Sequence, residues 1–174
     1  MREVGTDWAT CPGCGLQLPS VNWASDGRLQ NSPECWQLYT ELVGATMSQA
    51  GRAAAVQQLS IDAYGAQHAG PGVAPITTVF SLLGLFLAIE RGVPGYEVRD
   101  AHQRLAALDL RWPELTRPAR TGEVTVFDVA LADNPDEHVR LAHEWARSVW
   151  QDWEYCHPAI VELTERHLPD LARR

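Results

Sequence analysis

Two cysteines near the start of the chain have the spacing of a metal-binding turn. Cys11 and Cys14 are separated by two residues, so both thiolates can reach one ion from a single tight turn. Gly13 and Gly15 allow the open or left-handed backbone that aims amide groups at the sulfurs. A third thiol, Cys35, follows within the segment SPECW. These soft donors together predict a zinc site.

The fourth position of this zinc site has to be filled by a distant residue or by water. His68 is the preferred ligand, because it ends a predicted helix just before the Gly-Pro-Gly turn at 70–72, where its imidazole can leave the helical face. Cys156 and His157 form a rival corner, where a proline interrupts a helix. The predicted set of zinc ligands is therefore Cys11, Cys14, Cys35 and His68.

Other chemistry of a Cys-x-x-Cys pair fits the sequence less well. A thioredoxin-like redox pair needs a buried strand before it and a helix that opens at the first cysteine. Residues 1–10 have no apolar strand pattern, and a proline and two glycines follow within residues 12–15. Disulfides among the four cysteines are the alternative for an oxidising compartment.

Two classes of function fit such a zinc site. In a zinc-dependent enzyme, three protein ligands leave one position for water, and Tyr64, His68 or His157 moves a proton during hydrolysis or hydration of a small molecule. In a noncatalytic protein, four ligands close the site and the metal fastens the N-terminal segment to the rest of the chain. Sulfur-rich sites are typically structural, which favours the second class.

The aromatic residues of the chain are also compatible with a small-molecule pocket. The chain has seven tryptophans, and four of them lie between Trp112 and Trp153. Such residues either fill a core or form the walls of a pocket for an organic ligand. Their number alone does not decide between the two.

Composition argues against several partners. The net charge is −8 and no stripe of lysine or arginine follows the chain, which argues against nucleic acid. The first ten residues do not resemble a signal peptide, and the apolar stretches are too short to span a bilayer. We therefore expect a cytoplasmic protein of one domain, residues 1–174, whose oligomeric state the sequence does not indicate.

Helices are expected to position the candidate ligands. Ser32 and Pro33 are typical of a helix start and place Cys35 in the first turn, where amides and the helix dipole favour a thiolate. Residues 16–31 are expected to form a surface loop, in which a short hairpin is an option. The patterns predict an all-α fold, a compact bundle of about five or six helices within 33–171, with a zinc-knuckle segment, 1–35, packed on it. The longer helices are expected at 33–46, 53–68, 76–91, 96–110, 134–155 and from there to 171.

Several motifs together resemble an uncharacterised family of small bacterial proteins, described only as a domain of unknown function. They are CPGCG, SPECW, DAYGAQHAG, LAIERG and WARSVWQDWEYCHP. The resemblance implies a bacterial, mostly helical, metal-binding protein and supplies no activity. In that family's pattern a histidine is common where this chain has Ser81, and a histidine pair where it has Cys156 and His157. The resemblance therefore does not imply a site that needs both of these features.

Overall fold

A small hairpin followed by helices makes up the structure, a computed structural model that describes residues 7–47, 51–120 and 122–174. The hairpin is antiparallel and joins β1 (Trp8–Thr10) to β2 (Gln17–Pro19), with Ala9 opposite Leu18. The helices in chain order are α1 (Pro33–Met47), α2 (Arg52–Ala55), α3 (Gln57–Gln67), α4 (Pro75–Arg91), α5 (Gly95–Ala106), α6 (Val126–Ala130), α7 (Pro135–Asp152), the 3-10 turn η1 (Glu154–Cys156), α8 (His157–His167) and α9 (Pro169–Ala172).

The predicted all-α fold is confirmed. Helix α1 begins at Pro33 as predicted, and the side chain of Ser32 accepts a hydrogen bond from the backbone N–H of Cys35 at 3.2 Å. Helix α7 begins after Asn134, whose side chain accepts from the N–H of Glu137. These starts follow from polar N-caps that satisfy amides with no partner inside the helix.

Some boundaries differ from the prediction. The strand at Trp8–Thr10 was not predicted. It is short and mostly exposed, so it lacks the apolar pattern of a buried strand, and pairing with β2 forms it. Residues 1–6 lie outside the described part. The helix predicted at 53–68 is two helices, because Val56 leaves helical geometry with φ −99° and ψ 6°. The helix predicted to end near Tyr155 ends at Asp152, before η1 and the proline-initiated α8. The helix predicted to end at Leu110 ends at Ala106.

The core is built around α4, whose apolar side chains cover most of its surface. This helix packs against α3, α5, α7, α8 and α9. Leu82, Leu83, Leu85 and Leu87 are fully buried, and each such side chain contributes roughly 1.5–3 kcal/mol through removal from water. The sequence leaves open whether the four tryptophans between Trp112 and Trp153 fill a core or line a pocket. Trp145, Trp150 and Trp153 are buried in this core, and Trp112 is partly buried against it.

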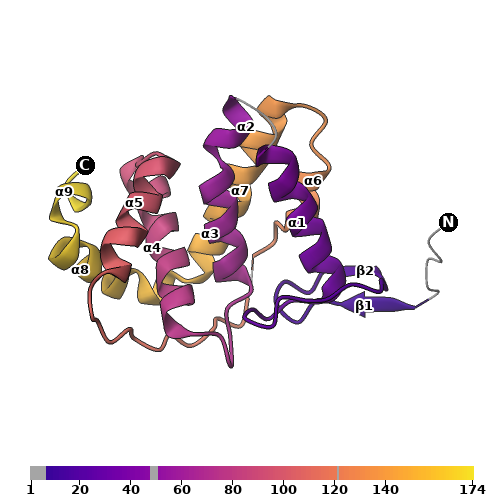
Figure 1. Ribbon diagram of the computed structural model, residues 1–174, viewed down its shortest axis with the longest axis horizontal. Helices are drawn as coiled ribbons and strands as arrows, with labels where there is room; N and C mark the ends of the chain where they lie inside the picture. Colours follow the sequence, from indigo (N-terminus) through magenta and orange to yellow (C-terminus); the bar gives the residue numbers. More distant parts are fainter. Residues whose placement is uncertain (1–6, 48–50, 121) are drawn as a thin grey trace.

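The hairpin and the C-terminal helices lie at opposite ends of the molecule (Figure 1). Strands β1 and β2 lie beside the lower end of α1 in this view, whereas α8 and α9 lie beside α4 and α5. One cluster of buried apolar side chains nevertheless extends from Cys11 to Leu171. Among the described residues, no helix has both the length and the hydropathy needed to cross a membrane.

Candidate metal centre

Three segments that are far apart in the sequence meet at one point next to the hairpin. The hairpin turn supplies two thiols, the first turn of α1 a third, and the residue after α3 an imidazole. Their ligand atoms all lie within 4.8 Å of one another, and the four residues, which we call the cysteine–histidine cluster, are Cys11, Cys14, Cys35 and His68. The Sγ of Cys35 lies 3.8 Å from the Sγ of Cys14 and 3.3 Å from Nε2 of His68.

The turn between β1 and β2 has the backbone of a metal knuckle. The N–H of Cys11 donates to the carbonyl of Leu16 at 2.8 Å, and the N–H of Gly15 donates to the carbonyl of Cys11 at 2.9 Å. Gly15 has φ 75°, a left-handed conformation that glycine adopts without strain. These bonds close the turn, and the sulfurs of Cys11 and Cys14 lie within 4.8 Å of each other.

His68 is oriented by its own helix. Its Nδ1 lies 2.8 Å from the carbonyl oxygen of Tyr64, one turn earlier in α3. A carbonyl only accepts, so Nδ1 carries the proton and Nε2 keeps a free lone pair that faces Cys35. Metal-binding histidines commonly have such a bond from the second ring nitrogen, which fixes the tautomer and raises ligand basicity. The ring of Tyr64 also stacks on that of His68, with centroids 3.9 Å apart.

Three thiols in this space cannot all ionise unless a cation lies between them. Hydrogen bonds with Cys14 and Cys35 hold the pKa of Cys11 far below its usual range. In return, the hydrogen bond with Cys11 raises the pKa of Cys14 to about 12 and also raises the pKa of Cys35. A divalent metal removes this conflict, because thiolates are its ligands and their charges are compensated.

The surroundings of Cys35 also suit a thiolate. The residue lies in the first turn of α1, where the helix dipole favours negative charge. The hydroxyl of Tyr64 donates to its sulfur at 3.6 Å and accepts from the side-chain amide of Asn31 at 3.1 Å. Burial raises the pKa of Tyr64, so the hydroxyl keeps the proton that it donates.

The knuckle is held against α3 by close backbone packing. A Cβ on Gly13 would lie 2.3 Å from Cδ2 of His68 and 2.3 Å from the carbonyl oxygen of Gln30, so this position has no room for a side chain. The N–H of Gln30 donates to the carbonyl of His68 at 2.8 Å. The glycine between the cysteines therefore serves the approach of the histidine as well as the turn.

Arg117 is a contact that the sequence did not reveal. Its guanidinium donates to the carbonyl of Pro12 at 2.8 Å and to that of Gly13, and so ties the connector after α5 to the knuckle. The residue is 104 positions from Gly13 in the chain, and nothing in the proline-rich connector marks it. Only the folded structure brings the two segments together.

The other predicted site residues divide between two places. Tyr64 lies at the cysteine–histidine cluster, 1% exposed. His157 begins α8, far from the hairpin in Figure 1, where its ring stacks on Trp150 at 3.6 Å and its Nε2 bonds to that residue's carbonyl. The thiol of the neighbouring Cys156 donates to the carbonyl of Trp153 at 3.1 Å. Among the described residues, the cysteine–histidine cluster is the one group of three or more such side chains placed to share a metal.

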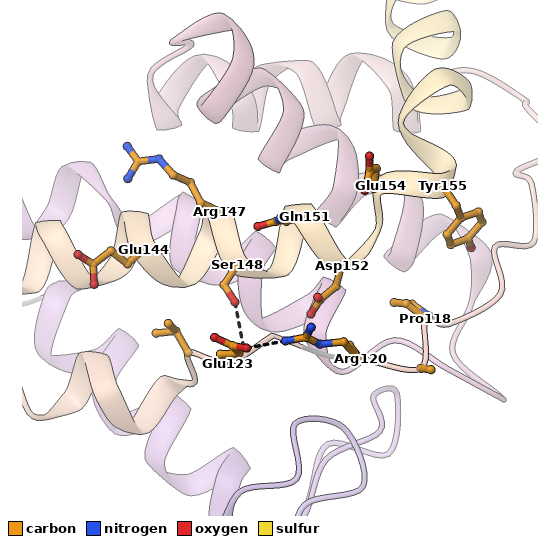
Figure 2. Close-up of a pocket in the computed structure, with 12 residues that line it drawn as sticks. Pro118, Arg120, Glu123, Glu144, Arg147, Ser148, Gln151, Asp152, Glu154 and Tyr155 are labelled. Atoms are coloured by element: carbon orange, nitrogen blue, oxygen red, sulfur yellow. Dashed lines mark hydrogen bonds and ion pairs between the residues drawn. The ribbon is translucent and has the colours of Figure 1, made fainter.

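A separate cavity of about 880 Å³ opens between the connector before α6 and the outer face of α7 (Figure 2). Arg120 forms an ion pair with Glu123 at 2.5 Å, and the N–H of Glu123 donates to the hydroxyl of Ser148 at 2.9 Å. The walls also carry Arg147 and three further acidic residues, Glu144, Asp152 and Glu154. Because groups of both signs line the cavity and partly pair with each other, its walls favour no particular class of ligand.

Comparisons with known proteins agree with this description. A model of DUF5946, a family of unknown function, matches residues 9–154. The chain therefore belongs to this family, as the motifs indicated. Neither the curated proteins nor the solved structures include a significant match to the chain.

Proposed function

We propose that this DUF5946 protein binds one zinc ion at the cysteine–histidine cluster, and that the metal fastens the N-terminal hairpin to α1 and α3. The observation that carries the proposal is the convergence of four ligand atoms within 4.8 Å from three separate segments. A structural zinc site has this composition, with three or four sulfurs and the balance from histidine. The metal would then stabilise the packing of the hairpin against α1 and α3.

Zinc is the metal that the donor set favours. Thiolates and imidazole are soft to borderline ligands, which suit zinc and fit poorly with magnesium or calcium. The four side chains would satisfy its tetrahedral preference. The oriented Nε2 of His68 and the hydrogen bond that Cys35 receives from Tyr64 support a preorganised metal site.

A closed site is favoured over a catalytic one. Four protein ligands leave no position for water, whereas a catalytic zinc usually keeps one open. Cys11, Cys35 and His68 are at most 1% exposed, so a substrate has no direct approach to them. Tyr64, the candidate for proton transfer, is equally buried and its hydroxyl is already used by Cys35 and Asn31. Together these observations make the enzyme the second choice.

We further infer that the protein functions in a reducing compartment, such as the bacterial cytoplasm. All four cysteines are free thiols in the structure. Thiols this close together would tend to oxidise to disulfides in a secreted protein, whereas metal binding by cysteine is typical of reducing compartments. Cell fractionation of a bacterium that produces the protein would test this inference, and recovery from the periplasm would contradict it.

Zinc content of purified variants tests the main proposal. The untagged wild-type protein should contain about one zinc per chain by elemental analysis, and Cys35→Ser should lose most of it. Cys156→Ser is the matched control, because it removes a buried thiol whose contact is a backbone carbonyl, and it should keep its zinc. A wild-type protein that is purified without zinc and does not take it up on addition would contradict the proposal.

A further inference from the structure

An apolar groove lies beside the hairpin, on the side of α1 that carries Glu34. It has a volume of about 730 Å³, within the range of small-molecule sites. Its walls come from β2 and the loop that follows, from α1 and from α6. The apolar side chains among them are Leu18, Pro19, Val21, Trp23, Leu38 and Phe127.

Several of these apolar side chains remain open to solvent. Trp23 is 48% exposed and Phe127 is 38% exposed, and they come from different elements, the loop after β2 and helix α6. Large aromatic side chains usually bury more of their surface than these two do. A patch of exposed apolar side chains commonly marks a binding site. The groove therefore offers an apolar surface that residues 7–47, 51–120 and 122–174 leave uncovered.

Glu34 gives the groove a specific polar feature. Its side chain is only 6% exposed, and its Oε1 accepts from the backbone N–H of Val21 at 3.0 Å. Its Oε2 is buried and has no hydrogen-bond partner within the described part of the chain. A buried carboxylate oxygen without a donor is costly, so such groups generally have a partner in the working protein.

The charge of the groove is of one sign. Glu41 lies two helical turns after Glu34 on the same face of α1 and also lines the groove. Among the lining residues there is no lysine or arginine. An anion is thus disfavoured, whereas a cation would find the carboxylates of Glu34 and Glu41 and the indole of Trp23 among the lining residues.

We propose that this groove binds a small organic cation, an ammonium group on an apolar body. The ammonium pairs with the carboxyl group of Glu34, whose side chain turns so that Oε2 accepts its hydrogen bond. The apolar body packs against Trp23 and Phe127. This binding site is separate from the cysteine–histidine cluster and does not depend on the metal's identity. A small ligand is favoured over a polymer because the polar feature is a single buried oxygen at one point of the groove.

Phenethylammonium is a suitable probe, with phenethyl alcohol as its uncharged analogue. Titration of zinc-loaded, 15N-labelled protein should shift the indole signal of Trp23 and the amide signals of Glu34 and Phe127. We expect a dissociation constant on the order of 1 mM or tighter for phenethylammonium, and binding at least about tenfold weaker for the alcohol.

Variants then separate the carboxylate from the apolar walls. Glu34→Gln should weaken phenethylammonium binding at least about tenfold and leave binding of the alcohol nearly unchanged. Glu162→Gln removes an exposed acid on α8 and should have no effect. Because Glu34 precedes Cys35, zinc content is measured for each variant. Trp23→Ala, in an exposed loop, should weaken binding about threefold or more and tests the groove even if Glu34→Gln fails to fold.

Three results would overturn the proposal. One is equal affinity for phenethylammonium and phenethyl alcohol in the wild-type protein. Another is full phenethylammonium affinity in both Trp23→Ala and a folded Glu34→Gln. The third is binding of the peptide acetyl-Ala-Lys-Leu-Phe-amide more than about tenfold tighter than the amine, since the groove would then be a surface for peptides.

Discussion

Cysteine and histidine come together at two places in this molecule, and their surroundings differ. At the hairpin, His68 directs Nδ1 to a backbone carbonyl and leaves Nε2 facing Cys35. At the start of α8, Nε2 of His157 is bonded to the carbonyl of Trp150, and the thiol of Cys156 donates to another carbonyl. The same residue types thus form a candidate metal site in one place and ordinary core contacts in the other. The two places differ in which side-chain atoms are hydrogen-bonded to backbone carbonyls: Nδ1 in His68, but Nε2 in His157 and the thiol in Cys156.

Removal of the metal should produce the largest difference between these two regions. In our proposal a metal on four ligands holds the knuckle, whereas the α8 corner is packed against the apolar helix α4. We expect chelation to accelerate hydrogen exchange at the amides of Cys11 and Gly15 about a hundredfold or more, with little change in α4. Mass spectrometry or NMR can measure this. Equal loss of protection in α4 would show that the metal stabilises the whole fold and not only the knuckle. Unchanged exchange at Cys11 would show that the metal does not stabilise the knuckle.

Substitution of each histidine tests the comparison directly. His68→Ala should lower zinc affinity at least about tenfold in competition with a chromophoric chelator, since even indirect contacts to a ligand matter on that scale. His157→Ala should leave zinc affinity nearly unchanged, although it loses the stacking on Trp150 and some stability. The reverse order of the two variants would move the metal site to the α8 corner.

A methyl group at the knuckle should have a smaller effect. Gly13→Ala places a Cβ against the ring of His68 and the carbonyl of Gln30, and we expect it to lower the free energy of unfolding by about 1–3 kcal/mol. Gly44→Ala is the control, because this position in α1 has open space and should gain roughly 0.5–1 kcal/mol from helix propensity. Denaturant unfolding of zinc-loaded protein measures both. A Gly13→Ala protein as stable as wild type would contradict the close packing of knuckle and histidine.

The smallest effect concerns the pH dependence of a buried acid on α3, the helix that His68 follows. Burial raises the pKa of Asp62, whose Oδ1 accepts from Gln58 at 3.1 Å and whose Oδ2 has no partner within the described residues. The folded state therefore binds this proton more tightly than the unfolded state. The free energy of unfolding should fall as pH rises above the unfolded pKa of about 4. In Asp62→Asn residue 62 does not titrate. Its free energy of unfolding, relative to that of wild type, should therefore rise by at least about 1 kcal/mol as the pH increases from 5.5 to 8.

Asp170→Asn is the control for that pH series. Arg104 holds the pKa of Asp170 at about 2, so this exposed carboxylate stays charged in folded and unfolded chains throughout the range. Its difference from wild type should not change with pH. Thermal unfolding with saturating zinc at each pH gives the comparison, and a constant difference between Asp62→Asn and wild type would contradict a raised pKa.

Local signals in the sequence predicted much of the fold. Ser32 with Pro33 and Asn134 with Pro135 start helices where the structure has them, because caps and prolines act within a few residues. The break at Val56 was missed, since neither a proline nor a glycine marks it. The strand at Trp8–Thr10 was also missed, because three residues are too few for a pattern and only pairing with β2 defines them.

The sequence predicted those residues of the candidate site that are marked by their spacing or by their position at the end of a helix. The Cys-x-x-Cys spacing indicated a knuckle, and the position of His68 before a turn indicated a side chain free to leave its helix. The contacts of Arg117, the close approach at Gly13 and the unpartnered oxygen of Glu34 were not predictable. They depend on how distant segments pack, and no local pattern records that.

X-ray absorption at the zinc edge tests the central claim most directly, because it counts the ligands of the bound metal. A closed structural site predicts three sulfur neighbours at about 2.3 Å and one nitrogen at about 2.0–2.1 Å, with the imidazole signal lost in His68→Ala and kept in His157→Ala. Two or fewer sulfurs, or a water oxygen in place of the imidazole of His68, would contradict the account.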